Sequence, residues 1–412
     1  MKPVERLIKY VEYPTGSDPE NADCPSNPKE WDFAKALAAE MEQLGFEDIE
    51  LDDKCYLTGT IPANSGGGSQ GGEDMAGVPV IGLIAHIDVS CEAPFENIKP
   101  QIIHYEGGDL IQDEAKDLRV PLEDYPFLEN YKGCDIITSD GTTLLGGDNK
   151  AGIAEIMTIA ERQKEFRHGK IRVCFTPDEE IGRSSDFFDV EKFGADFAYT
   201  VDGDAFGEVQ SETFNAASAT VHVKGFGIHP GSAKGMMKNA NRMACEFDSM
   251  LPEDERPETT EGYEGFYHLV TMSGMVESAT MNYILRDHDH GKLEKRAEFI
   301  QKMCDKMNAK YGEGAFSVEI EYAYRNMKEI LDQYPDLVRI PLDVLREMGV
   351  EPDTAPIRGG TDGAFLSFKG LPCPNLGPGG HNFHSKQEFA VVQSMDNAVE
   401  MLEKILTRFA SK

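Results

Sequence analysis

A histidine and an aspartate that could serve a metal, His86 and Asp88, stand at the end of the apolar run IGLIAHIDVS. Residues two apart in a strand point to the same face, so the His86 imidazole can face a metal while Asp88 orients it from behind. A buried histidine hydrogen-bonded to a nearby carboxylate would give the same pattern. This segment alone therefore leaves a metal site and a satisfied core pair equally open.

Two adjacent glutamates, Glu179 and Glu180, follow a second apolar run in the segment TPDEEIG. Adjacent side chains point in different directions, so one carboxylate can bind a metal while the other holds a water and acts as general base. In a chain this rich in acids, an acidic pair alone is more often a solvated turn.

Three further residues extend the set of candidate ligands. Asp202 ends an apolar run in YTVDGD, and Asp148 lies in a glycine-containing loop that opens a helix in GGDNKAGIAE. His384 occurs near the C-terminus in HNFHSKQEF. Each aspartate alone fits a turn or a helix cap better than a metal site.

The location that these residues share favours a metal centre. Four of the sites lie at the C-terminal ends of apolar strands or in the loop that follows, and ligands bind at that edge of an open α/β sheet. Histidine and carboxylate without thiolate suit zinc, with manganese or cobalt as alternatives. One bridging carboxylate would let two metals about 3.5–4 Å apart share and activate a water.

A sheet with helices between its strands would position these residues. Helical spacing predicts helices at 30–46 and 150–166, and apolar runs predict strands at 79–85, 171–176 and 195–201. Continuous apolar strands separated by helices are typical of a mostly parallel sheet covered on both faces, so we expect an α/β fold. The stretch NSGGGSQGG predicts a loop between two strands.

The middle of the chain has a different pattern. Strand, helix, strand, strand, helix and strand follow one another over 213–326, which is the ferredoxin-like order. Helical patterns near 335–348 and 392–410 then continue the first domain. We therefore expect a catalytic domain of 1–212 and 327–412 and an inserted α+β lid domain of 213–326, with a cleft between the two.

Composition and charge exclude several classes of partner. The 412 residues include 40 Lys and Arg and 73 Asp and Glu, which gives a formal net charge of −33. Nucleic-acid and anionic membrane surfaces need basic patches, so we expect neither partner.

The N-terminus MKPVERLIKYVEY predicts an amphipathic helix and not a signal peptide, and no apolar run of about 18 residues follows. We expect a cytoplasmic protein.

The motifs together resemble the peptidase T family of aminotripeptidases, a branch of the two-zinc metallopeptidases that also include aminoacylases and glutamate carboxypeptidases. The resemblance runs from near the N-terminus to the last helix. It is dense in IAHIDVS, SDGTTLLGGDNKAGIAEIM, IRVCFTPDEEIG, AYTVDGD, HPGSAKG, YILRDHD, PIRGGTDGA and LPCPNLGPGGHNFHSKQEF. It implies a zinc-peptidase-like catalytic domain and release of the N-terminal residue from short peptides.

The resemblance implies a ligand set for two zinc ions. His86 and Asp202 would bind one ion, whereas Glu180 and His384 would bind the other. Asp148 would bridge the two. Manganese or cobalt could replace zinc in such a site.

The resemblance also implies roles beside the metals. Glu179 would be the general base, and Asp88 would orient His86. The donor to the oxyanion of the reacting carbonyl resembles the histidine of the HPG segment, here His229.

Two arginines, Arg286 in YILRD and Arg358 in PIRGGTDG, are candidates to hold the terminal carboxylate of a peptide, because a guanidinium donates two parallel hydrogen bonds. A structural ion pair is an equal alternative for each arginine. Two departures from the family pattern bear on specificity and not on metal chemistry. Asn149 stands where the family has a second aspartate, and Asp204 stands in place of a glycine.

Three functions are compatible with these residues. The first is a tripeptide aminopeptidase, and the second is a related two-metal amidohydrolase that acts on N-acyl amino acids or other dipeptides. The third is a non-catalytic metal- or peptide-binding protein, which would have no use for a base such as Glu179. We expect a small peptide as substrate and, by analogy with relatives, a homodimer formed through the inserted domain.

Overall fold

The structure is a computed structural model that describes residues 1–65, 75 and 77–411. Most of the predicted loop 64–72 therefore lies outside the described residues. Contacts divide the chain into two compact units. The larger unit comprises 1–211, 330–354 and 361–412, and the smaller unit comprises 212–329 and 355–360.

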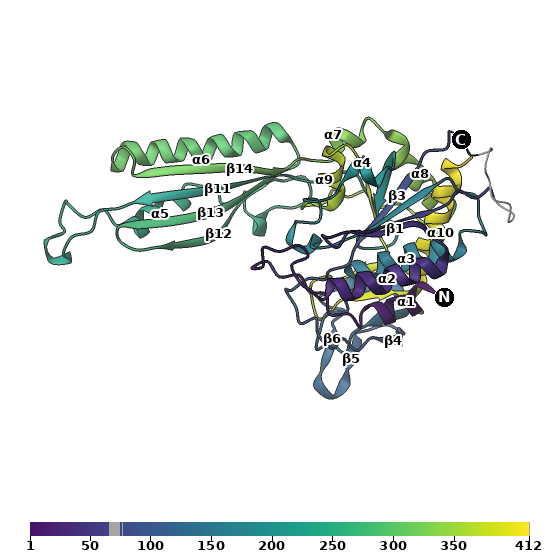
Figure 1. Cartoon of the computed structure of the whole chain (residues 1–412). Helices are drawn as coiled ribbons and strands as arrows, with labels where there is room; N and C mark the ends of the chain where they lie inside the picture. The colour runs from purple at the N-terminus through teal and green to yellow at the C-terminus, as the bar shows by residue number, and fades with distance from the viewer. Residues whose placement is uncertain (66–74, 76, 412) are drawn as a thin grey trace. The chain divides into compact units, whose positions relative to one another are not determined.

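The larger unit is built on a mixed seven-stranded sheet within the described residues (Figure 1). Its strands, in spatial order, are β1 (Glu47–Leu51), β2 (Leu57–Ile61), β8 (Ile171–Thr176), β3 (Ile81–His86), β9 (Phe197–Thr200), β15 (Asn375–Leu376) and β10 (Val209–Gln210). The four strands from β8 to β15 are parallel, and the flanking pairs are antiparallel. Every residue of β3 and β8 is buried, as expected for parallel strands covered on both faces. The expected α/β fold with a mostly parallel central sheet is confirmed.

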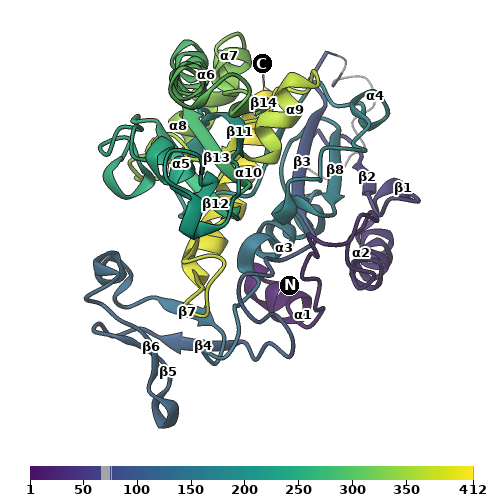
Figure 2. The same ribbon diagram turned by 90° about the vertical axis from the view of Figure 1, so that its left-hand side faces the viewer.

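Helix α3 packs against the centre of this sheet (Figure 2). Its residues are buried along almost its whole length. Helix α3 comprises Gly147–Arg162. The other helices of the unit are α1 (Pro3–Tyr10), α2 (Glu30–Leu44), α4 (Val190–Phe193), α8 (Pro335–Glu347), α9 (Asp362–Phe368) and α10 (Val392–Phe409). Contacts join α3 to α1, α2 and α10, whereas side chains of α4 and α9 pack with Ile84 and Cys174 of the sheet. The short helix α7 (Lys328–Leu331) spans the boundary between the units along the chain.

The larger unit also contains short strands that the sequence did not predict. They form a four-stranded sheet in the order β16 (Gly380–His381), β17 (Phe389–Val391), β7 (Asp135–Thr138) and β4 (Gln101–His104), and a hairpin of β5 (Leu110–Asp113) and β6 (Leu118–Val120). Strands of two to four residues give too few alternations to show a period of two in the sequence. This second sheet binds the segment 380–391, which carries His384, to the segment 101–138.

The smaller unit is an antiparallel sheet with two helices on one face. Its strands are ordered β12 (Phe266–Gly274), β13 (Ser278–Asp287), β11 (Asn215–Lys224) and β14 (Phe316–Tyr324), and its helices are α5 (Ala240–Asp248) and α6 (His290–Tyr311). Figure 1 shows α6 running along the sheet. Alternate residues of β11 and β13 are buried beneath the helices around Phe247 and Ile300, so one sheet face forms the core. The chain order of strands and helices matches the predicted ferredoxin-like order.

One internal segment groups differently from the expected boundaries, in addition to the end residues 212 and 327–329. Residues 355–360 belong with the smaller unit, although the sequence assigned them to the catalytic domain. The cause is backbone pairing beside the start of β11: Ile357 N–H donates to Glu212 O at 2.8 Å, and Phe214 N–H donates to Gly359 O at 3.2 Å. Arg358 therefore lies in the smaller unit. In the part of the chain that the structure describes, no helix has the length and apolar character needed to cross a membrane.

Candidate metal centre

Three parallel strands deliver three of the five candidate ligands, His86, Glu180 and Asp202, to one edge of the main sheet. His86 is the last residue of β3 and is paired in register with Thr176, the last residue of β8. Ile84 is paired with Thr200, the last residue of β9, so Asp202 emerges level with His86. The carboxyl ends of parallel strands meet at one edge, which explains why residues far apart in sequence converge there.

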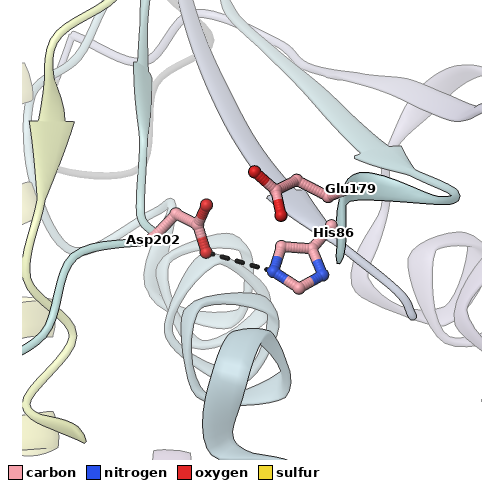
Figure 3. Close-up of side chains that lie close together, drawn as sticks. All are labelled: His86, Glu179 and Asp202. Carbon is pink, nitrogen blue, oxygen red and sulfur yellow. Dashed lines mark ion pairs between the residues drawn. The ribbon is translucent and has the colours of Figure 1, made fainter. Parts of the chain in front are cut away.

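The His86 imidazole contacts three carboxylates. Its Nε2 lies 3.0 Å from Asp148 Oδ1 and 3.2 Å from Asp202 Oδ1, and its Nδ1 lies 3.2 Å from Asp88 Oδ1. Figure 3 shows the carboxylates of Asp202 and Glu179 beside the His86 ring, with the Asp202 contact dashed. Nε2 faces the candidate metal region, and Nδ1 faces the orienting carboxylate of Asp88. A metal-binding histidine uses one ring nitrogen for the metal and donates the N–H of the other to such a carboxylate.

Asp88 is fully buried and holds several groups in place. Its Oδ1 accepts the N–H of Glu179 at 3.1 Å, and its Oδ2 accepts the N–H of Glu180 at 3.1 Å. These two glutamates lie in a short 3-10 helix, Glu179–Ile181, directly after β8. Asp88 therefore connects the orientation of His86 to the placement of both glutamates.

His384 approaches from the second sheet. Its Nε2 lies 2.8 Å from Glu180 Oε2 and 3.3 Å from Asp148 Oδ2, while its Nδ1 lies 3.3 Å from Glu92 Oε2. The two carboxylate oxygens of Asp148 thus face two different histidines, Oδ1 toward His86 and Oδ2 toward His384.

The donor set fits divalent cations. One buried carboxylate oxygen, Glu180 Oε1, has no hydrogen-bond partner within the described residues, and Asp202 Oδ1 has only its ion-pair contact with His86 Nε2. Leaving such atoms unsatisfied costs free energy, and a cation would satisfy them. Candidate metal-holding groups are formed by His86 with Asp148 and Glu180, and by His86 with Glu179 and Asp202. The second group includes the residue expected to be the base.

Burial and mutual repulsion shift the protonation of the carboxylates. Burial raises the pKa of Glu180 to about 7, and the negative charge of Asp148 acts in the same direction. Burial also raises the pKa of Asp202 to about 7, and it raises the pKa of Glu179 well above its usual range with the help of Asp202. Positive charge at the centre would relieve this repulsion.

The pKa values of the two histidines are also raised, because the neighbouring carboxylates stabilise the protonated imidazole. Burial alone would lower the pKa of His86, but Asp202 and Asp148 raise it well above the usual value. Hydrogen bonds to Asp148 and Glu180 raise the pKa of His384 to about 11. The contacts with both histidines lower the pKa of Asp148, although its burial acts in the opposite direction.

Two residues that support the candidate ligands had no predicted role. Asn375 Oδ1 accepts the N–H of Asp202 at 3.0 Å and the hydroxyl of Thr200 at 2.9 Å. The buried carboxylate of Glu388 accepts backbone N–H groups of the loop that carries Asp148. The sequence signals for Glu388 were its place in the motif LPCPNLGPGGHNFHSKQEF and its position directly before the apolar run FAVV.

The three predicted substrate-binding residues lie in the smaller unit. His229 is exposed, and its Nδ1 accepts the N–H of Gly231 at 3.2 Å, so its Nε2 can carry the proton. The Arg286 guanidinium lies 5.4 Å from the centre of the Tyr324 ring, and its Nη1 donates to Leu285 O at 3.0 Å.

Arg358 is engaged by its own unit. Its Nη1 donates to Gly262 O and Glu264 O, both at 2.8 Å, and its Nη2 donates to the Thr260 hydroxyl at 2.9 Å. The guanidinium also lies 5.1 Å from the ring centre of Phe214. These contacts favour the structural alternative for Arg358, although carbonyl groups and a ring replace the expected ion pair.

Comparisons with known proteins place these residues in a family context. The profile described as Peptidase family M20/M25/M40 matches residues 143–408. A curated protein named Peptidase T from Caldanaerobacter subterraneus is 46% identical over 415 residues, which cover 100% of this chain and 99% of that protein.

Solved structures show the same fold. A tripeptidase from Staphylococcus aureus and the aminopeptidase PepT from Bacillus cereus each match with a TM-score of 0.77 and 20% identity, covering 100% of this chain and 98% of theirs. A dinuclear metal-binding M20 peptidase from Bacillus subtilis matches with a TM-score of 0.61 and 15% identity, covering 99% of this chain and 98% of its own.

Proposed function

The chain belongs to peptidase family M20/M25/M40 and, within it, to the peptidase T family, and from this membership we propose that it is a tripeptide aminopeptidase with a two-metal centre. The names of its relatives support this substrate class: one is called Peptidase T and another a tripeptidase. The substrate would be a short peptide with a free N-terminus.

The observation that carries the two-metal proposal is the position of Asp148. Its two oxygens lie 3.0 Å from His86 Nε2 and 3.3 Å from His384 Nε2. A carboxylate between two histidines suits a ligand that bridges two ions. We assign Asp202 to the ion beside His86 and Glu180 to the ion beside His384, each on the basis of its short contact.

Two ions at this site, zinc or alternatively manganese or cobalt, would polarise the scissile carbonyl and lower the pKa of a water. The residues of the chain perform the proton transfers. Glu179 accepts the proton of the attacking water and returns it to the leaving amine. Its backbone N–H is held by Asp88, which also orients His86. His229 is proposed to donate to the developing oxyanion, and Arg286 to bind the peptide carboxylate.

Hydrolysis of a tripeptide panel tests the proposed function. The zinc-loaded protein should release the N-terminal residue from free tripeptides and should fail on N-acetylated forms. Activity on the blocked forms with none on the free forms would instead favour the related N-acyl amidohydrolase. Zinc binding without any hydrolysis would favour a binding protein.

Replacement of the base tests the mechanism. Glu179→Gln keeps the shape of the side chain but removes its ability to accept a proton, so kcat should fall by at least about 100-fold. Zinc content, measured by elemental analysis, should remain close to that of the parent protein. A variant with unchanged kcat would refute the assignment of Glu179 as base.

A homodimer through the smaller unit is a further part of the proposal. It is supported by the edge strand β12, which exposes Val270 and Met272, because an unpaired edge can be covered by a second chain. Light scattering coupled to gel filtration should give twice the mass of one chain. Val270→Lys should then yield monomers, and a monomeric parent protein would refute the proposal.

A further inference from the structure

Glu388 presents a buried carboxylate to four successive backbone N–H groups. Its Oε2 accepts from Leu145 at 2.8 Å and Gly146 at 2.9 Å. Its Oε1 accepts from Gly147 at 2.7 Å and Asp148 at 3.1 Å. The side chain is 1% exposed, so water does not compete for these bonds. An ionised carboxylate has about four acceptor positions, and this loop uses all of them.

The loop is shaped to surround that carboxylate. Gly146 adopts φ +77°, in the left-handed region that favours glycine. A Cβ atom at Gly147 would lie 3.1 Å from Glu388 Oε1, so a larger residue would press on the bond. The loop also leads into the N-terminus of α3, where an anion is favoured by the helix dipole. The loop therefore has no room to shift unless the carboxylate moves with it.

Glu388 is also connected to the other side of the centre. Its N–H donates to Ser385 O at 3.3 Å, and its carbonyl oxygen accepts the Thr138 hydroxyl at 2.8 Å. Ser385 follows His384 directly in the chain. One residue thus fixes the backbone of Asp148 through its side chain and closes the turn next to His384 through its main chain.

We propose that Glu388 is a positioning residue of the metal centre: its carboxylate fixes the loop 145–148 so that the two oxygens of Asp148 face His86 and His384. The inference rests on the proposed two-metal function, and Glu388 itself need not touch a metal. The loop is held before any ion arrives, so the site is preorganised for binding. The competing explanation is that Glu388 contributes only to the stability of the fold.

Glu388→Gln separates these explanations because it changes a single atom of the contact. The side-chain amide places an NH₂ group where one oxygen faced two N–H donors, so two of the four bonds are lost without a change in volume. Glu155→Gln is the matched control. Glu155 is a fully buried glutamate of α3, the helix that follows the loop, and neither of its carboxylate oxygens has a hydrogen-bond partner within the described residues.

Zinc affinity and amide exchange provide the two readouts. Competition with a chromophoric chelator should show that Glu388→Gln binds zinc about 10- to 100-fold more weakly, the range typical for loss of a group that orients a ligand. Hydrogen exchange of the metal-free protein should show faster exchange confined to the amides of 145–148. Glu155→Gln should leave both unchanged.

Each outcome decides the proposal. A lower Tm for Glu388→Gln with parental zinc affinity would overturn it in favour of a purely structural role. If that variant does not fold, Glu388→Asp decides instead: it keeps the charge but is one methylene too short for four bonds, and unchanged affinity would overturn the proposal. Failure of the parent protein to cleave tripeptides, with the zinc results as expected, would refute the proposed function and leave this inference standing.

Discussion

At the scale of single residues, Asp88 shows how one carboxylate can order a centre without reaching the metals. It is fully buried, it lies 3.2 Å from His86 Nδ1, and it accepts the N–H groups of Glu179 and Glu180. A carboxylate only accepts hydrogen bonds, so three donors can converge on it. The His86 ring and the two glutamates therefore depend on one side chain.

Asp88→Asn should weaken the centre while keeping its shape. The new NH₂ group must face at least one of the donors, and loss of such an orienting group typically costs about 10- to 100-fold in metal affinity or activity. Zinc competition and kcat measure the effect. Asp287→Asn, a buried aspartate of the smaller unit, is the control and should leave zinc affinity unchanged. An Asp88→Asn protein with parental affinity and kcat would contradict the role.

The burial of Glu155 predicts that the free energy of unfolding of the protein depends on pH. Burial raises its pKa well above the ordinary value of 4.5, and the charge of Asp396 acts in the same direction. Because the pKa of Glu155 is higher in the folded state, its contribution to the free energy of unfolding is complete below pH 4.5. That contribution is lost as the pH rises from there toward the folded-state pKa. The loss approaches about 1.4 kcal/mol for each pH unit in that window.

Glu155→Gln removes this titration. The variant should therefore gain free energy of unfolding relative to the parent protein, and the gain should be larger at pH 8 than at pH 5. Urea unfolding at the two pH values measures the difference. Equal effects at both pH values would show that Glu155 is not held protonated in the folded protein.

At the scale of elements, the close approach of α3 to the end of β9 places the Asp148 loop beside the strand ends that carry the other candidate ligands. A Cβ atom at Gly152 would overlap the carbonyl oxygen of Val201 and would lie 2.5 Å from Asn149 Oδ1. The helix can therefore approach the end of β9 only with glycine at this position. Asp148 and Asp202, which flank this contact in sequence, are brought together by it.

Gly152→Ala should displace α3 from the sheet. We expect a loss of about 1–3 kcal/mol in stability from overpacking, together with weaker zinc binding. Gly291→Ala in α6 is the matched control, because its Cβ would meet only Asp289 Oδ1, at 3.3 Å. The Gly291→Ala control should leave the free energy of unfolding unchanged or raise it, because alanine favours the helix more than glycine does. Unchanged zinc affinity in Gly152→Ala would show that the centre tolerates a shift of the helix.

At the scale of the whole molecule, the candidate ligands all belong to one of two units that have separate cores. A ligand that binds only the folded state stabilises it by mass action, by about 4 kcal/mol at 1,000 times its Kd. Metal should therefore stabilise the larger unit selectively.

Removal of metal tests this selectivity. Treatment with EDTA should speed amide exchange in β3, β8 and β9 and lower the Tm of the larger unit. Exchange in β11 and β13, which form the core of the smaller unit, should stay the same. Equal changes in both units would show that they unfold as one body.

The sequence by itself determined the candidate ligands and the order of the main elements. His86, the two glutamates and Asp202 could be placed because each ends or follows a buried strand, and the apolar run that predicts the strand also locates its end. The parallel arrangement then implies one edge for all of them. The family followed from long motifs whose order along the chain is specific.

Only the tertiary structure decided what surrounds those residues. Glu388 contacts backbone groups 240–243 residues away, and Asn375 contacts Asp202 across 173 residues. The Arg358 guanidinium donates its hydrogen bonds to carbonyl groups of 260–264. The second sheet consists of strands that are too short to show a period of two in the sequence. Contacts of this kind leave no local pattern in the sequence, because they depend on where the folded chain brings distant backbone atoms together.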